Sequence, residues 1–198
     1  MIYIIGLGNP GEEYENTRHN FGFCVLDLLA KKYDGMFKEK TYGKTTVHES
    51  KIKIARSSVI LIKPQTFMNN SGMVISALKL LKKDAEKVMV IHDELAIAEG
   101  TLKVSFNKSA GGHKGVESII KAIKTEGIAR IRIGAAPATP SGKLKPLRGE
   151  KEVLDRILKQ MPPAQFKKMQ PIFKNAVTAA EIFAEEGIGK AMTIGNNL

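Results

Sequence analysis

The residues best suited to acid–base chemistry are two histidines that lie close to polar partners. His19 precedes a stretch with helical periodicity, and the pair His92–Asp93 ends an apolar run that begins at Lys87. Histidine accepts a proton near neutral pH, and a neighbouring aspartate can fix its tautomer and stabilise its cation. These positions predict a general base that is oriented by a carboxylate. The alternatives are a histidine that caps or packs the helix start and a carboxylate that serves an ordinary turn.

Asparagines accompany both histidines. Asn9 and Asn20 lie around His19, and the stretch PQTFMNNSG at 64–72 follows another β-branched run. An asparagine amide donates to one partner and accepts from another, which suits contact with a peptide backbone or an oxyanion. In open α/β sheets such groups gather beyond the carboxyl ends of strands. For Asn70 or Ser71 the alternative is a helix N-cap.

Two glycine-rich turns have the composition of phosphate-binding loops. The first, GLGNPG at 6–11, matches the dinucleotide-binding pattern G-x-G-x-x-G, so a nicotinamide-linked oxidoreductase is an alternative. Against it, Pro10 removes a backbone N–H, three acids follow at 12–18, and helical periodicity begins only near Asn20. The second turn, SAGGHKG at 109–115, combines glycines with a cation before a helix and predicts a phosphate cradle.

Other kinds of chemistry lack their sequence signature. There is no G-x-S-x-G elbow for a serine hydrolase. His19, His48, His92 and His113 show no metal-ligand spacing, and the single Cys24 offers neither a thiolate cluster nor an intramolecular disulfide. These residues therefore give no sign of a metal site, and no cofactor is expected.

The positive charge is concentrated in one segment. The net charge is +11, and residues 101–170 hold 15 Lys and Arg against 5 Asp and Glu, whereas residues 1–100 hold 14 against 12. Such a segment predicts a patch that faces a polyanion, such as a nucleic acid. The alternative is a lysine-rich solvated surface.

Strand and helix patterns alternate along the 198 residues, which fit one domain. We predict strands at 1–6, 44–48, 51–55, 59–63, 87–92, 101–106 and 129–134. We predict helices at 20–33, 71–81, 115–124, 150–160 and 163–186. This order predicts an α/β single-domain sandwich over 1–198, with a twisted mixed β-sheet flanked by helices.

Two segments outside these elements have their own character. Residues 135–149 contain three prolines, two glycines and three basic residues, which predicts a mobile basic lid loop. Residues 188–198 are expected to form a frayed tail. The N-terminus lacks a signal-peptide pattern and no run approaches the roughly 18 apolar residues of a membrane span, so we expect a cytoplasmic protein.

Five stretches together resemble the bacterial peptidyl-tRNA hydrolases. They are GLGNPGEEYENTRHNFGF at 6–23, PQTFMNNSG at 64–72, VIHDEL at 90–95, SAGGHKGVESI at 109–119 and RIRIG at 130–134, in the family's order. The resemblance implies a monomeric, metal-free enzyme that cuts the ester between a peptide or N-blocked amino acid and the 3′ end of tRNA. Such an enzyme recycles tRNA released from stalled ribosomes, and its basic segment is expected to meet phosphates of the acceptor and TΨC stems.

The resemblance also implies roles for single residues. His19 corresponds to the catalytic base and Asp93 to the carboxylate that orients it. Asn9 corresponds to the asparagine that discriminates peptidyl from free aminoacyl substrates. Three further positions match residues that contact the tRNA or peptide end: Tyr14, Phe67 and Asn69.

The chain departs from the family pattern at two positions. Lys114 stands where the family usually has asparagine, and an ammonium group accepts no hydrogen bond, so we expect it to meet terminal phosphates instead. Ala96 stands where an acid often follows the HDEL-like stretch. A catalytically silent RNA-binding protein is the alternative from another class, but it would not need His19, Asp93 and the asparagines together.

Overall fold

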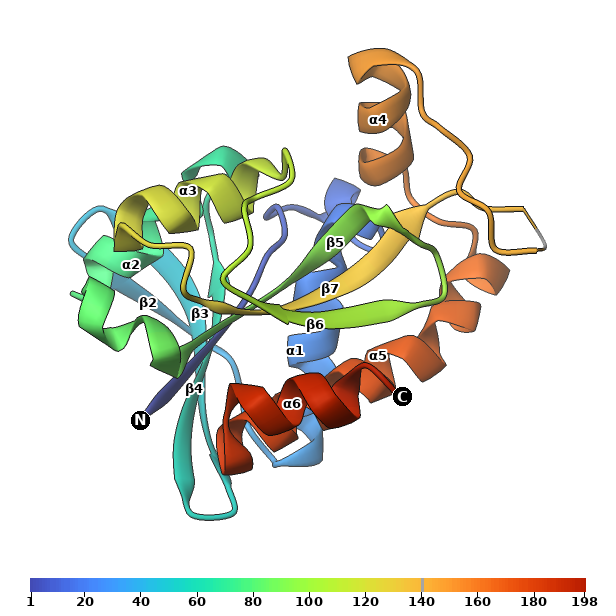
Figure 1. Cartoon of the computed structure of the whole chain (residues 1–198). Coiled ribbons are helices and arrows are strands. Elements are labelled where there is room, and N and C mark those ends of the chain that lie inside the picture. The colour runs from blue at the N-terminus through green and yellow to red at the C-terminus, as the bar shows by residue number, and fades with distance from the viewer. Residues whose placement is uncertain (140) are drawn as a thin grey trace.

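The structure is a computed structural model that describes residues 1–139 and 141–198 (Figure 1). Pro140, within the predicted lid at 135–149, lies outside the described residues. The strands are β1 (Ile2–Gly6), β2 (Lys38–Tyr42), β3 (Thr45–Ile54), β4 (Ser57–Pro64), β5 (Val88–Ala98), β6 (Leu102–Phe106) and β7 (Ala129–Ala136). The α-helices are α1 (Phe21–Lys32), α2 (Met73–Ala77), α3 (Lys114–Ile123), α4 (Gly149–Leu158), α5 (Pro163–Glu186) and α6 (Ile188–Gly195). Short 3-10 turns are η1 (Glu12–Tyr14), η2 (Arg18–Asn20), η3 (Met68–Asn70) and η4 (Lys82–Lys87).

One seven-stranded mixed sheet forms the centre, in the order β2-β3-β4-β1-β5-β7-β6. Strands β4, β1, β5 and β7 run parallel, whereas β2, β3 and β6 are antiparallel to their neighbours. The parallel strands are buried on both faces, which explains why runs such as Val88–Ile91 are continuously apolar. The predicted α/β sandwich with a mixed sheet is therefore confirmed.

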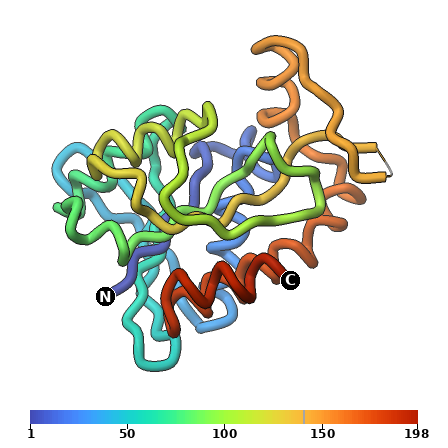
Figure 2. The backbone as a smooth tube through the Cα atoms, viewed as in Figure 1, coloured from blue at the N-terminus to red at the C-terminus, as the bar shows by residue number. Residues whose placement is uncertain are grey.

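Helices cover both faces of this sheet, as Figure 2 shows in the tube trace. On one face α1 and α5 form a core around Phe21, Phe173 and Phe183. On the other face α2 and α3 bury Val116 and Ile119 against the central strands. The two apolar layers hold the sheet rigid between them, and the polar residues gather at one end of the strands.

The strand predictions were wrong at the edge of the sheet. A single strand, β3, runs from Thr45 to Ile54 where two were predicted, and β2 was not predicted at all. Lys40 and Tyr42 on β2 both donate hydrogen bonds to the buried carboxylate of Glu49 on β3. These polar contacts across the two strands leave no apolar alternation for a sequence pattern to detect.

The prediction of a frayed tail at 188–198 was also wrong. Helix α6 occupies Ile188–Gly195, with Ala191 fully buried. Beyond it, the Asn196 side chain accepts a hydrogen bond from Val104 N at 2.7 Å and donates one to Val104 O at 3.1 Å. This amide therefore satisfies the outer backbone groups of β6, the last strand of the sheet.

Helix α2 is shorter than the predicted helix at 71–81, because Lys79 adopts a positive φ of 55° and ends the helical path. At the predicted lid, β7 continues to Ala136 and α4 begins at Gly149. Helix α4 stands out from the body of the molecule (Figure 1). Within the described part of the chain, no helix has both the length and the apolar character needed to cross a membrane.

Candidate active site

The polar residues singled out in the sequence meet where the parallel strands end. The loop after β1 carries Asn9, and the loop after β4 carries Phe67, directly before η3. Strand β5 itself carries Asp93. The carboxyl ends of parallel strands lie at one edge of a sheet, so these loops converge. One detail of the prediction was wrong. Asp93 does not end its strand, because β5 continues to Ala98 along β7, with a register shift after Glu94.

A close approach of backbones brings His19 to this edge. His19 lies on η2, directly before α1. A Cβ on Gly22 would lie 2.3 Å from Leu7 N and 2.4 Å from Ile91 O, so only glycine lets the first turn of α1 rest on the end of β1 and on Ile91 within β5. The glycine turn at 6–11 does not lead directly into an α-helix, since α1 begins only at Phe21, as predicted.

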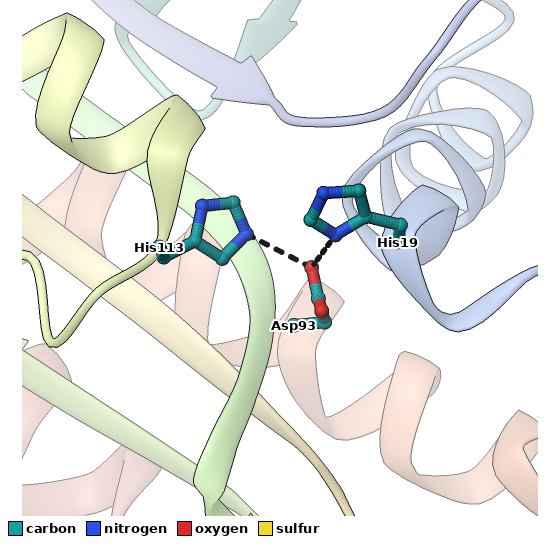
Figure 3. A group of neighbouring side chains, drawn as sticks. All are labelled: His19, Asp93 and His113. Atoms are coloured by element: carbon teal, nitrogen blue, oxygen red, sulfur yellow. Dashed lines mark hydrogen bonds and ion pairs between the residues drawn. The ribbon is translucent and has the colours of Figure 1, made fainter. Parts of the chain in front are cut away.

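Two imidazole rings converge on one carboxylate oxygen (Figure 3). His19 Nδ1 and His113 Nε2 each lie 2.9 Å from Asp93 Oδ1. Asp93 is 2% exposed. Burial by itself would raise the pKa of its carboxyl, but the charges and hydrogen bonds of the two histidines outweigh burial and lower this pKa well below its usual range. Asp93 is therefore a carboxylate at neutral pH.

The hydrogen bonds fix the tautomers of both rings. His113 Nδ1 accepts from Gly115 N at 3.2 Å and Val116 N at 3.3 Å, where it caps α3. Its proton therefore lies on Nε2, which donates to Asp93. In His19 the nitrogen that faces the carboxylate is Nδ1, which donates to it. The lone pair of His19 Nε2 is left to accept a proton.

His92 is not among the described residues that line the cavity, but it packs against His113, which does line it. The side chain is fully buried, and its Nδ1 donates to Asp93 O at 2.6 Å. Burial, followed by the charge of His113, lowers the pKa of His92 well below its usual value. His92 therefore stays neutral, and its ring packs 4.8 Å from that of His113.

Hydrogen bonds hold the backbone N–H, the backbone carbonyl and the side-chain oxygen of Asn9. Asn20 accepts from Asn9 N at 2.8 Å and donates to Asn9 O at 3.0 Å. The side-chain Oδ1 of Asn9 accepts from Met68 N at 2.9 Å. This contact orients the amide so that Nδ2 is the group available to a bound molecule.

A cavity of about 540 Å³ opens above these residues. Most of the predicted site residues line it: Asn9, His19, Phe67, Asn69, Asp93 and Lys114. Its opposite side is the apolar face of α4, hereafter the α4 wall, formed by Val153, Leu154, Ile157 and Leu158. The cavity thus joins a proton acceptor and amide donors to an apolar surface, a combination typical of ligand-binding sites.

Sequence reasoning and structure differ at three places. The described residues that line the cavity do not include Tyr14, which lies on η1. Lys114 lines the cavity, but its side chain is 73% exposed and its ammonium group lies 3.8 Å from Glu117. His113 and the α4 wall were not predicted. The only signal for His113 was its place before α3 in the second glycine-rich turn.

The same side chains could also hold a cation. His19, Asp93 and His113 each offer one ligand atom, and these atoms lie within 4.8 Å of one another. Both ring nitrogens already face the carboxylate oxygen at hydrogen-bond distance. Metal-free chemistry accordingly stays a prediction from the sequence.

Comparison with known proteins gives one consistent result. A family model described as Peptidyl-tRNA hydrolase matches residues 3–197. A peptidyl-tRNA hydrolase of Thermodesulfovibrio yellowstonii is 38% identical over 201 residues, covering 100% of each chain. One of Carboxydothermus hydrogenoformans is 39% identical, covering 98% of this chain and 97% of that protein. The crystal structure of peptidyl-tRNA hydrolase from Acinetobacter baumannii is similar with a TM-score of 0.82 at 27% identity, covering 99% of this chain and 94% of that one.

Proposed function

Because the chain belongs to the peptidyl-tRNA hydrolase family, we propose that it cuts the ester between a peptide and the 3′ end of tRNA, with His19 as the base that activates water. The hydrolase activity rests on the family. The role of His19 rests on one observation, its 2.9 Å contact with the buried carboxylate of Asp93 at the floor of the cavity. The family model and the relatives confirm, at the level of the family, the resemblance that the five sequence stretches indicated.

The proposed reaction needs one proton acceptor. His19 Nε2 takes a proton from water, and Asp93 stabilises the imidazolium that forms. The hydroxide attacks the ester carbonyl, whose oxyanion is met by an amide of Asn9 or Asn69, or by a backbone N–H near Gly111–Gly112. The carbon–oxygen bond to the ribose breaks, and its oxygen takes the proton from His19. The products are a free tRNA 3′ hydroxyl and a peptide carboxylic acid, which ionises by releasing its proton to solvent.

The same proposal covers the substrate. Asn9 Nδ2, held toward the cavity by the contact of Oδ1 with Met68, would bind the blocked amino end and so discriminate against free aminoacyl-tRNA. Phe67, which is 60% exposed, and Asn69 would contact the 3′ end, as would Tyr14 from outside the cavity. Lys114 would leave Glu117 for a terminal phosphate.

The basic segment at 101–170 would bind phosphates of the acceptor and TΨC stems, with 135–149 as a mobile lid. We further propose that the enzyme works as a monomer in the cytoplasm and recycles tRNA from stalled ribosomes, without a metal or cofactor. The substrate and the single cysteine are in keeping with that compartment.

The direct test is release of the amino acid from N-acetyl-aminoacyl-tRNA by the purified chain, with unblocked aminoacyl-tRNA as the matched control. We expect rapid release from the blocked substrate and slow release from the free one. Tight tRNA binding without release would favour the silent RNA-binding alternative. Binding of a nicotinamide cofactor without release would favour the oxidoreductase alternative.

A further inference from the structure

A single carboxylate joins three separate elements beside the cavity. Glu99 follows β5 and accepts hydrogen bonds on Oε2 from Arg18 Nε at 2.6 Å and Arg156 Nη2 at 2.5 Å. Its Oε1 accepts from Gln165 Nε2 at 2.6 Å. The Glu99 side chain is 18% exposed and that of Arg18 only 5%, so water screens these contacts poorly.

Each partner of Glu99 comes from a different part of the site. Arg18 directly precedes His19 on η2. Arg156 lies on α4, next to Ile157 of the α4 wall. Gln165 lies in the first turn of α5. Glu99 therefore connects the segment of the proposed base to the helix that forms the opposite side of the cavity.

Helix α4 has little else to hold it. Ile157 is its one buried residue, and the helix projects away from the sheet (Figure 1). Its anchoring contacts lie at the carboxyl end, where Arg156 Nε donates to Ala135 O at 2.9 Å and Arg156 O accepts from Arg18 Nη1 at 3.2 Å. Directly beyond α4, Met161 N also donates to Asn16 O at 3.0 Å and tethers the next residues to the segment before η2. Among the residues of the helix itself, Arg156 makes the polar contacts that position the α4 wall.

The two guanidinium groups would repel each other without the carboxylate. Arg18 and Arg156 bind the same oxygen of Glu99. Burial, followed by the charge of Arg18, lowers the pKa of Arg156, and Glu99 opposes this effect. If the negative charge were removed, two like charges would face each other, one of them in a buried side chain. Repulsion would then push α4 away from η2.

We propose that Glu99 is a positioning residue that holds the α4 wall against the catalytic cavity by binding Arg18 and Arg156 together. This inference rests on the proposed function, because it requires the substrate to contact the cavity between His19 and the α4 wall. Glu99 would then set the affinity for substrate rather than the proton transfer at His19.

The test compares Glu99→Gln with Glu181→Gln. Glu181 is the control, since its carboxylate also binds a cation and a neutral donor, Lys32 at 2.6 Å and Tyr33 at 2.9 Å, but lies on α5 and is not among the described residues that line the cavity. For N-acetyl-aminoacyl-tRNA we expect Glu99→Gln to raise KM roughly tenfold with little change in kcat, because the substrate loses its contact with the displaced α4 wall. Amide hydrogen exchange over 149–158 should become faster. Glu181→Gln should change neither KM nor the exchange rate over 149–158.

A second pair of variants separates repulsion from general damage to the fold. Arg156→Gln keeps the pair of Arg18 with Glu99, and it should also raise KM and speed exchange in α4. Adding Arg156→Gln to Glu99→Gln removes one of the two facing charges, and with it their repulsion, and should bring KM back at least partway toward the wild-type value.

Several results would overturn the proposal: an unchanged KM in Arg156→Gln, the same KM rise in Glu181→Gln, or a loss of kcat alone in Glu99→Gln. If the wild-type chain released no amino acid at all, the proposed function would fail instead. Hydrogen exchange over α4 needs no substrate, so it would still decide whether Glu99 holds this helix.

Discussion

At the residue scale, the main feature is that one oxygen of Asp93 accepts two imidazole N–H groups. His113 is committed to two contacts, because its other nitrogen caps α3. His19 is committed to only one, so its second nitrogen is free for water. The asymmetry between the two rings follows from the helix cap, and it supports the proposal that His19 is the base.

The pH dependence of stability tests the state of Asp93. A carboxyl whose pKa is depressed by folding contributes stability that is fully present above its unfolded pKa of about 3.9 and is lost as pH falls through the folded value. Asp93→Asn should therefore be less stable than wild type at neutral pH, and the difference should narrow below about pH 4. Urea unfolding at several pH values measures it. A difference that stays constant on acidification would contradict the assignment.

Two substitutions at His113 separate its contacts. His113→Ala should lower the free energy of unfolding by about 1 kcal/mol, the usual effect of losing an N-cap. His113→Asn should restore that stability, because asparagine caps helices well, but its shorter side chain should not reach Asp93. Because neither alanine nor asparagine at this position would contact Asp93, we expect kcat to be lower than in the wild type in both variants. Recovery of kcat together with stability in the asparagine variant would show that the Asp93 contact is dispensable.

The sequence could predict the residues of the site better than their connections. His19, Asp93 and Asn9 stood out by type, position and family pattern. His113 contacts the same carboxylate from a different element of the fold. No spacing within a short stretch of sequence could predict this contact. The same holds for Glu99, since its partners lie far away along the chain.

At the element scale, the parallel strands were predictable because burial on both faces requires apolar, β-branched runs. The elements that were missed, β2 and α6, depend on tertiary contacts. β2 is stabilised by the Glu49 carboxylate and α6 by packing on the sheet edge. Their own residues carry a weak pattern, so propensity alone could not identify them.

The Asn196 contact provides a test at this scale. Asn196→Ala would expose Val104 N and O at the edge of the sheet and should lower the free energy of unfolding by about 1–2 kcal/mol, the effect of two hydrogen bonds. Amide exchange at Val104 should rise. Asn197→Ala is the matched control, because its side chain bonds only to Thr193 within the exposed tail. Equal losses in the two variants would argue against a specific edge contact.

At the scale of the whole molecule, the positively charged segment 101–170 includes α3 and α4, which both line the cavity, and the predicted lid between β7 and α4. The remaining segments are close to neutral. A tRNA bound by its stems would therefore bring its 3′ end toward His19 without base readout.

Salt dependence measures this binding. The Kd for deacylated tRNA should rise with KCl with a log–log slope of about 0.7–0.9 per phosphate contacted. Lys114→Asn should reduce the slope by about 0.7–0.9, the value for one phosphate contact. Lys190 is an exposed lysine on α6 outside the segment, so Lys190→Asn should leave the slope unchanged. A flat salt response in the wild type would refute the phosphate contacts.

The most direct test of the central claim is single-turnover release of amino acid from N-acetyl-aminoacyl-tRNA by His19→Ala. The ring of His19 contacts Asp93 but makes no part of the apolar core, so the variant should keep its fold by circular dichroism. The rate should fall by about 10²–10⁴, the contribution of a general base. A folded His19→Ala variant that releases amino acid at the wild-type rate would contradict the account.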